Sequence, residues 1–243
     1  MNTKNVSSRE AEIIDEIEGR EMLFFSPTDI SRFLGIEKRN AYNLLSRMQK
    51  KELVERIESG KYVLTKKYNS RDIYELASNI IKTSYLGFFS ALHFHSLTEQ
   101  VPQKTQIAST KRKNSLNIQG RKAEFVKIRP EDFFGYEDYN GVVSSDPEKT
   151  LIDCLRLPQK AGDFSNIAGL EFKNFHTEKL IRYCEKTGSS AVASRLGYLL
   201  DQNEVKFNKE RLKTITSYYC KLDPGKNNKN ASKEWKIYAN REI

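Results

Sequence analysis

The sequence predicts an α+β protein in which an N-terminal winged helix-turn-helix is followed by a larger mixed α+β domain. Residues 25–64 contain two segments with helical periodicity and then two short β-prone runs, which is the order of that fold. Behind them, two helical segments precede four short strand-like runs, a pattern typical of an α+β domain. The polar stretch at residues 66–71 separates the two patterns. We therefore expect domains at residues 1–67 and 68–243.

The first helix of the pair is predicted to begin after Ser26. A serine at the N-cap accepts a hydrogen bond from a free backbone N–H, and Pro27 suits the first helical turn. Ile30 and Phe33 then fall on one helical face. Gly35 can adopt the left-handed conformation that ends a helix.

Residues 37–51 are predicted to form the second helix, and its buried stripe has the i, i+3, i+4, i+7 spacing: Ala41, Leu44, Leu45 and Met48. The opposite face carries donors, amides and an aromatic ring but no carboxylate: Arg39, Tyr42, Asn43, Ser46 and Lys50. Lys38, Asn40 and Arg47 stand near the helix start or on its flanks. A helix that only meets solvent more often mixes Glu with Lys on its exposed face. We interpret this helix as one that reads DNA.

The wing is predicted from two β-prone runs at residues 53–57 and 61–65, with a turn at residues 58–60. Lys61 and Tyr62 stand beside its tip, where a wing can reach phosphate or the minor groove. Two alternatives remain open at this point: a three-helix domain with a basic surface, and a winged helix that contacts protein. Upstream, a helix capped by Ser7 or Ser8 and ending at Gly19 is expected, with Ala11, Ile14 and either Ile17 or Glu18 on its inner edge. Residues 21–25 would add a short strand.

In the larger domain, helices are predicted at residues 72–82, 85–95, 178–186 and 190–201, and strands at residues 106–109, 116–118, 123–128, 142–145 and 235–239. Another helix is expected to start at Asp146-Pro147-Glu148. There the aspartate can cap the helix, the proline fits its first position, and both acids complement the positive end of the helix dipole.

The overall charge favours a polyanionic partner. The formal net charge is +9, with 38% hydrophobic and 11% aromatic residues, so the chain can also build a core. No stretch approaches the roughly 20 apolar residues that a membrane span requires, and the polar N-terminus is unlike a signal peptide. The three scattered cysteines form no C-x-x-C pair, which indicates free thiols in a reducing cytoplasm.

Sites for chemistry are weakly indicated. His93 and His95 stand two residues apart, so on a helix they would point to different faces and would not share a metal. A nuclease would need acids spaced to hold Mg²⁺. In the cluster of Asp146, Glu148, Lys149 and Asp153 the acids stand beside Pro147 at a helix start, and helix capping explains them without a metal. We expect no enzyme, no catalytic residue, no metal and no cofactor.

Four ordered blocks resemble the C-terminal domain of the AbiEi family of antitoxins, the partners of nucleotidyltransferase toxins. They are SALHFHSLTEQVP at residues 90–102, DPEKTLID at 146–153, RLGYLL at 195–200, and LDP at 222–224 with Trp235 near the end. That family also carries an N-terminal winged helix. The resemblance implies an antitoxin of a type IV toxin–antitoxin (abortive infection) system. Its first domain would bind repeats in its own operon promoter, and its second would counter the toxin.

These observations together predict a cytoplasmic, non-enzymatic transcriptional repressor that binds double-stranded DNA, with no membrane association and with pairing of two copies on the operator. Arg39, Tyr42, Asn43 and Ser46 would approach base edges, with Asn40 beside them. Lys38, Arg47, Lys50, Lys61 and Tyr62 would hold the backbone. The first alternative is a stand-alone regulator whose C-terminal domain senses a ligand or dimerises. The second is a degenerate metal-dependent nuclease.

Overall fold

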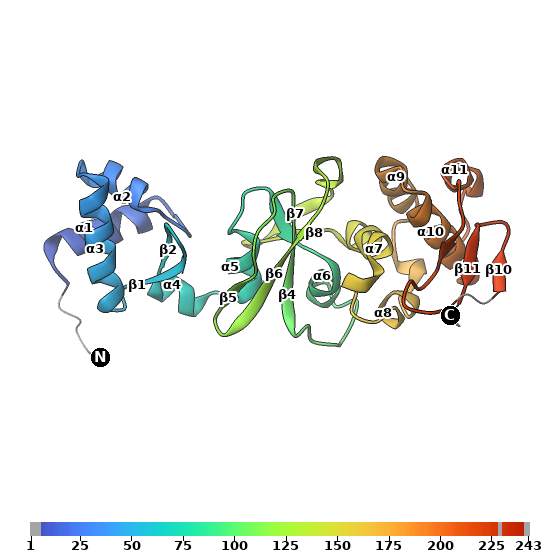
Figure 1. Cartoon of the computed structure of the whole chain (residues 1–243), viewed down its shortest axis with the longest axis horizontal. Coiled ribbons are helices and arrows are strands. Elements are labelled where there is room, and N and C mark those ends of the chain that lie inside the picture. Colours follow the sequence, from blue (N-terminus) through green and yellow to red (C-terminus); the bar gives the residue numbers. More distant parts are fainter. Residues whose placement is uncertain (1–5, 228–229, 241–243) are drawn as a thin grey trace.

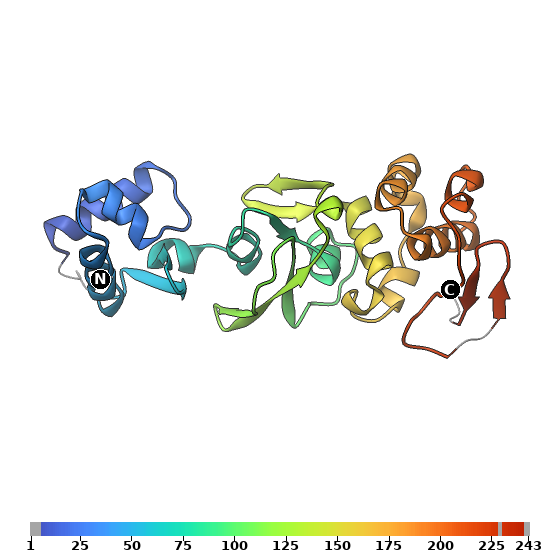
Figure 2. The same cartoon turned by 45° about the horizontal axis from the view of Figure 1, so that its top comes forward.

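The computed structural model describes residues 6–227 and 230–240. Residues 1–5 of the predicted domain 1–67 lie outside the described residues. So do residues 228–229 and 241–243 of the predicted domain 68–243. The molecule is elongated, and the chain runs from one end to the other (Figures 1 and 2). We call residues 6–70 the first module and residues 72–240 the second module. The boundary predicted after residue 67 falls inside the helix α4 and stays a prediction.

The first module has the helix-turn-helix order expected from the sequence, followed by a hairpin. Its elements are α1 (Ser8–Gly19), α2 (Pro27–Leu34), α3 (Lys38–Lys50), β1 (Val54–Glu58), β2 (Lys61–Leu64) and α4 (Thr65–Ser70). Ser26 caps α2 by accepting from the Asp29 N–H at 3.2 Å, and Gly35 ends it in the left-handed region at φ +60°. The predicted strand at residues 21–25 is reduced to a single bridge between Phe25 and Tyr62.

The inner face of α1 differs in part from the prediction. Ile17 is fully buried as expected, and Glu18 is exposed. Ile13, which was not predicted, is also fully buried, whereas Ala11 and Ile14 are only half-buried. The helix begins where expected, because Ser7 and Glu10 form a reciprocal capping box. The carboxylate of Glu10 also receives Lys51 Nζ at 2.8 Å, which fixes α1 against the end of α3.

The second module is built on a mixed six-stranded sheet with the order β5-β6-β4-β3-β8-β7. Its strands are β3 (Ser84–Leu86), β4 (Lys104–Ser109), β5 (Leu116–Ile118), β6 (Arg121–Lys127), β7 (Tyr136–Tyr139) and β8 (Val142–Ser145). The pairs β3–β8 and β4–β6 are parallel, and the other pairs are antiparallel. The α+β class is thereby confirmed.

Side-chain alternation gives this sheet two different faces. Ile107 and Phe125 point to the side covered by α5 (Ile73–Ser78), whereas Ala108 and Val126 belong to the hydrophobic cluster on the other side. That second cluster includes residues of α6 (Phe88–Phe94) and α7 (Pro147–Arg156). Figure 1 shows α5 on the side of the sheet nearer the first module, with α6 and α7 on the far side.

Beyond the sheet, the chain forms a helical end closed by a small three-stranded sheet of order β10-β11-β9. Its elements are α8 (Ser165–Ala168), α9 (Thr177–Thr187), α10 (Ser190–Gln202), α11 (Lys209–Lys213), β9 (Cys220–Lys221), β10 (Asn230–Ser232) and β11 (Ile237–Ala239). Short 3₁₀ turns lie at Pro130–Asp132, Pro158–Lys160 and Phe172–Asn174. Trp235 is 1% exposed and packs within the same cluster as Leu196 and Leu199 of α10.

The segment at residues 85–95 was expected to be a single helix, and this expectation is wrong. Tyr85 and Leu86 belong to the central strand β3, and α6 begins only at Phe88. Gly87 lies between them with an extended backbone and packs close to Ala108 and the Tyr85 ring. The sequence also gave no indication of β7, an edge strand with three exposed residues.

The two modules are joined by apolar contact. Leu23, Phe24 and Ile57 of the first module, with Tyr68 of α4, pack against the cluster formed by α5 and the near face of the sheet. Two polar contacts reinforce this junction, since Lys113 pairs with Glu58 and Lys61 Nζ donates to the Ile80 carbonyl. Within residues 6–227 and 230–240, no helix combines the length and apolarity needed to cross a membrane.

Gly197 of α10 is expected to tolerate no side chain. A Cβ there would lie 2.2 Å from Cζ3 of Trp235, inside van der Waals contact. Gly197→Ala should therefore lower the free energy of unfolding by about 1–3 kcal/mol. Unfolding in urea, followed by the fluorescence of the single tryptophan, measures this. Gly19→Ala is the matched control, because nothing lies within 4 Å of its added Cβ; equal stability of the two variants would contradict the prediction.

Candidate nucleic-acid interface

The helix α3 has the buried stripe that the sequence predicted. Ala41, Leu44, Leu45 and Met48 are all at most 3% exposed and pack with α1, α2 and the hairpin. The turn before α3 is held by Ser31, whose hydroxyl donates to the Ile36 carbonyl at 2.6 Å. The opposite face of α3 is thus directed away from the core.

The outward face of α3 carries every residue predicted for it. All of them are exposed: Lys38, Arg39, Asn40, Tyr42, Asn43, Ser46, Arg47 and Lys50. Tyr42 is 44% exposed, and none of these side chains is packed against the second module. Gln49 is also exposed on this helix, a position that the sequence reading did not single out.

These side chains have no protein partner within the described residues. No side-chain hydrogen bond, ion pair or ring contact engages any of them. Other basic residues behave differently: Arg211 pairs with Glu178 and Glu185, and Arg129 with Asp132. The helix holds four basic residues and no acid, so its positive charge is not compensated locally. Such a surface attracts a polyanion.

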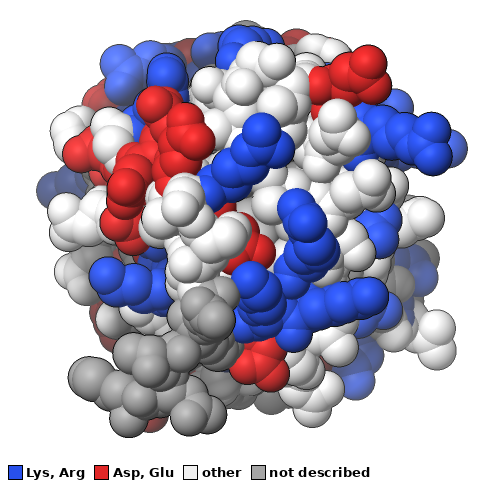
Figure 3. Space-filling model, turned by 90° about the vertical axis from the view of Figure 1, so that its left-hand side faces the viewer, with Lys and Arg blue, Asp and Glu red and all other residues white. Residues whose placement is uncertain are grey.

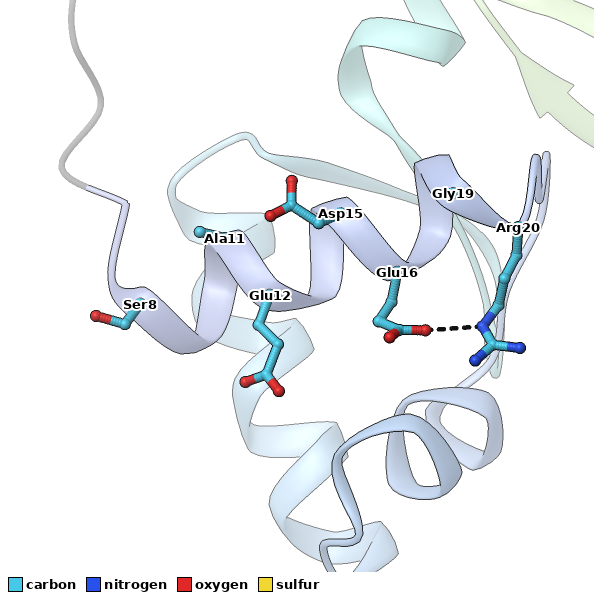
Figure 4. Close-up of a pocket in the computed structure, with 7 residues that line it drawn as sticks. All are labelled: Ser8, Ala11, Glu12, Asp15, Glu16, Gly19 and Arg20. Atoms are coloured by element: carbon cyan, nitrogen blue, oxygen red, sulfur yellow. Dashed lines mark hydrogen bonds and ion pairs between the residues drawn. The ribbon is translucent and has the colours of Figure 1, made fainter.

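The helix α1 has the opposite charge. Its outer surface carries Glu12, Asp15 and Glu16, which line a shallow hollow together with Arg20 (Figure 4). Arg20 Nε is 2.8 Å from Glu16 and its guanidinium lies 4.5 Å from the Phe33 ring. Viewed end-on, the molecule shows lysine and arginine side chains across the centre and right, with acidic groups at the upper left, at the upper right and between the basic side chains (Figure 3). The two helices thus differ in charge, since α1 is rich in acids and α3 carries only basic charges.

The wing does not present the residues expected of it. Tyr62 is 5% exposed and stacks on Phe25, with ring centroids 6.3 Å apart. The prediction that Tyr62 contacts phosphate is therefore wrong, because its side chain belongs to the core of the first module.

Lys61 is likewise turned inward. Its amine donates to the Ile80 carbonyl and lies 3.7 Å from Glu58, at the junction between the modules. Burial lowers the pKa of Lys61 below its ordinary value, and the nearby Lys113 adds to this effect while Glu58 opposes it. The predicted backbone contact by Lys61 does not fit this placement. Local sequence could not reveal it, since the contact joins residues 19 positions apart across two modules.

The first module is similar to a known protein family. Residues 12–65 match the family model described as "Transcriptional regulator, AbiEi antitoxin". The AbiEi resemblance is confirmed for this region. The match covers α2, α3 and the hairpin, and most of α1. The blocks that first suggested the family, from residue 90 onward, lie outside the matched residues.

The fold of the whole chain also occurs in a solved structure, titled "Crystal structure of RV2827C protein from Mycobacterium tuberculosis". The similarity has a TM-score of 0.59 and covers 96% of this chain and 92% of that one, at 12% sequence identity. At this identity the likeness concerns the fold alone. No curated protein sequence is significantly similar to this chain.

The two histidines of the AbiEi-like block at residues 90–102 have separate partners. His93 Nδ1 is 3.1 Å from the Tyr74 hydroxyl, whereas His95 Nε2 is 2.6 Å from the Ser145 carbonyl. Burial lowers the pKa of His95, which the Ser145 contact partly opposes. Across the described residues, no group of three or more His, Cys, Asp or Glu side chains is arranged to hold a metal ion.

The acids of the AbiEi-like block at residues 146–153 serve helix α7 and its neighbours. Asp146 accepts from the Lys149 N–H at 2.8 Å and from the Tyr183 hydroxyl at 2.8 Å. Glu148 lies 2.9 Å from Lys179 Nζ and accepts from the His176 N–H at 3.0 Å. The capping expected at Asp146 is therefore confirmed, and ion pairing accounts for Glu148.

Lys149 is fully buried with its charge paired. Its ammonium pairs with Asp153 and donates to the Tyr85 hydroxyl at 3.0 Å, and that hydroxyl donates to Asp153 at 2.7 Å. Burial raises the pKa of Asp153, although Lys149 opposes the shift. Burial together with Asp153 also raises the pKa of Tyr85. This closed triad holds β3 against α7.

Removing the buried ammonium should destabilise the second module strongly. Lys149→Met leaves Asp153 without its counter-charge, and the expected loss is about 3–5 kcal/mol in the free energy of unfolding. Arg20→Ala, which breaks an exposed pair with Glu16, should cost less than about 1 kcal/mol. Urea unfolding followed by circular dichroism compares the two. A Lys149→Met protein as stable as the parent would show that Asp153 needs no counter-charge.

Proposed function

We propose that the protein is a DNA-binding transcriptional repressor that acts as the antitoxin of a type IV toxin–antitoxin system. The match of residues 12–65 to AbiEi antitoxin transcriptional regulators supports regulation of transcription. One structural observation carries the DNA-binding part of the proposal: the outward face of α3 is basic, exposed and unpaired within the described residues. We assign the protein to the cytoplasm and give it no enzymatic role.

In this proposal α3 enters the major groove of duplex DNA. Arg39, Tyr42, Asn43 and Ser46 approach base edges, and Asn40 lies beside them. Arginine can bind guanine and asparagine can bind adenine through two hydrogen bonds each, so Arg39 and Asn43 are the residues best suited to select sequence. The backbone would be held by three side chains on the start and flank of the helix: Lys38, Arg47 and Lys50.

A single copy has one such helix, and its β1–β2 hairpin packs against the second module and is not available for DNA. Binding to operator repeats therefore involves two copies, each reading one repeat. The operator would be that of the protein's own operon, which makes the protein autoregulatory. The second module would counter a nucleotidyltransferase toxin encoded beside it.

Base-reading and backbone-holding residues should behave differently when replaced. Arg39→Ala and Asn43→Ala should each relax sequence preference at one base pair, at a cost of about 1–3 kcal/mol. Arg47→Ala and Lys50→Ala should weaken binding to all DNA sequences alike. Each should also reduce the slope of log K against log salt concentration by about one. Gel-shift titrations at several salt concentrations, on operator and scrambled duplexes, distinguish the two classes.

Lys206→Ala is the matched control for charge, because Lys206 is exposed far from α3 in the sequence. Lys61→Ala should leave the salt slope unchanged, because that amine faces Ile80. An unchanged operator footprint in both Arg39→Ala and Asn43→Ala would reject α3 as the reading helix.

The antitoxin activity is expected to survive loss of DNA binding. The Arg39→Ala/Asn43→Ala protein should restore growth of cells that express the adjacent nucleotidyltransferase as well as the parent protein does. Growth curves and co-purification of the two proteins measure this. A neighbouring toxin that stays lethal in the presence of the intact antitoxin would contradict the proposal, and would favour a stand-alone regulator whose second module senses a ligand or dimerises.

A further inference from the structure

The second module contains a cavity that the regulatory function does not use, and we propose that it binds a neutral heteroaromatic base, a purine or a pyrimidine. The cavity has a volume of about 330 Å³, which lies within the range of small-molecule sites. It is formed by the start of α6, the segment leading into β4, and the turn after α7. The inference does not rest on the proposed function.

Gln106 provides the first argument. It is 4% exposed, lines the cavity, and lies on the face of β4 directed toward α6. Its Oε1 accepts from the Phe89 N–H at 3.1 Å, which fixes the orientation of the amide. Within the described residues its Nε2 makes no hydrogen bond, and this nitrogen is not one of the fully buried polar atoms that lack a partner, so it borders accessible space. Polar groups in proteins normally have a partner, and a carbonyl or ring nitrogen of a bound base would accept from this amide.

Phe89 provides a surface on which a base can stack. Its ring is half-buried and forms part of the cavity wall. The preceding residue, Phe88, has φ +55°, a conformation that a bulky residue rarely adopts. Such strain is typical of functional sites. A Cβ added at Gly162 would lie 3.4 Å from the Phe89 ring, so the glycine lies close to the ring and a base would stack on the part of the ring that faces the cavity.

The rim of the cavity suits the edge of a base. Gln100, Gln103 and Gln159 line it and are exposed. An amide offers both donors and an acceptor, as the edges of nucleobases do, and an aromatic ring stacks on any base. The combination of one aromatic ring with several amides is therefore more typical of a base than of a purely apolar ligand.

The positive charge beside the cavity is partly neutralised, which is compatible with a neutral ligand. Lys104, at the rim, lies 2.9 Å from Glu124, and Lys160 lies 2.9 Å from the same carboxylate. Partial burial raises the pKa of Glu124, but its hydrogen bonds with Lys160 and Lys104 outweigh this and leave the pKa below its usual value. The carboxylate thus stays ionised and partly neutralises the two ammonium groups.

A second hollow of about 320 Å³ adjoins the cavity, since Gln159 and Gly162 line both. It is more polar and includes Lys226. This hollow gives room for the sugar attached to a base. The base could come from a free nucleoside or from an unpaired position of a single-stranded nucleic acid.

The test is calorimetric titration of the full chain with adenosine, guanosine, cytidine and uridine in turn, and with short single-stranded DNA. We expect saturable binding of at least one nucleoside if the source is a free ligand. Saturable binding of the oligonucleotide alone would identify the source as single-stranded nucleic acid. Gln106→Glu keeps the oxygen that accepts from Phe89 but removes the amide donor, and Phe89→Leu removes the stacking surface. Each should weaken binding about tenfold or more.

Gln202→Glu is the matched control, because Gln202 is exposed at the end of α10, and it should leave the affinity unchanged. Circular dichroism checks that each variant folds. If Gln106→Glu does not fold, the affinities of Phe89→Leu and of the exposed Gln159→Ala test the proposal in its place. Absence of saturable binding by all nucleosides and the oligonucleotide, or equal affinity in the folded cavity variants, would overturn the proposal. Arg39→Ala should bind the nucleoside normally, so this result is separable from failure of operator binding.

Discussion

The apolar contact between the hairpin and the sheet decides which surfaces of the first module remain accessible. Leu23, Phe24 and Ile57 cover the near face of the second module together with α5. Because the hairpin lies in this contact, Lys61 is turned inward, whereas the basic residues of α3 stay exposed and unpaired within the described residues. The orientation of α3 therefore depends on burial at a distance from it. Apolar burial is the main favourable term in such an association.

Charge is distributed unevenly over the chain, although its net value is strongly positive. In the second module several arginines and lysines are paired with acids, as Arg129 is with Asp132 and Lys179 with Glu148. These pairs contribute to packing. In the first module, α3 carries four basic residues and no acid, so positive charge is concentrated on one helix there.

Local signals in the sequence predicted the helices of the first module well. Ser26, Pro27 and Gly35 set the ends of α2, and the four apolar positions of α3 are the four that are buried. The same kind of signal predicted the start of α7 at Asp146. In each case the cause is short-range, since a cap or a helical stripe depends on residues a few positions apart.

Predictions from the sequence were wrong where contacts between residues far apart in the chain determine the structure. Tyr85 and Leu86 sit in a three-residue strand buried on both faces, so they show no alternation, and their apolar run resembles a helix. Tyr62 was predicted at the DNA surface from its place beside a turn, but its partner Phe25 lies 37 residues away in the chain. The cavity around Gln106 was not predicted at all, because its walls come from segments that only the fold brings together.

The extended layout has a consequence for how two partners could share this molecule. The N-terminal helices and the C-terminal strands occupy opposite ends (Figures 1 and 2), so a duplex held at one end leaves the other free of steric conflict. Simultaneous occupancy is then the default. Any cooperativity between the ends requires a free-energy coupling carried through the junction between the modules, which includes the contact of Lys61 with the Ile80 carbonyl.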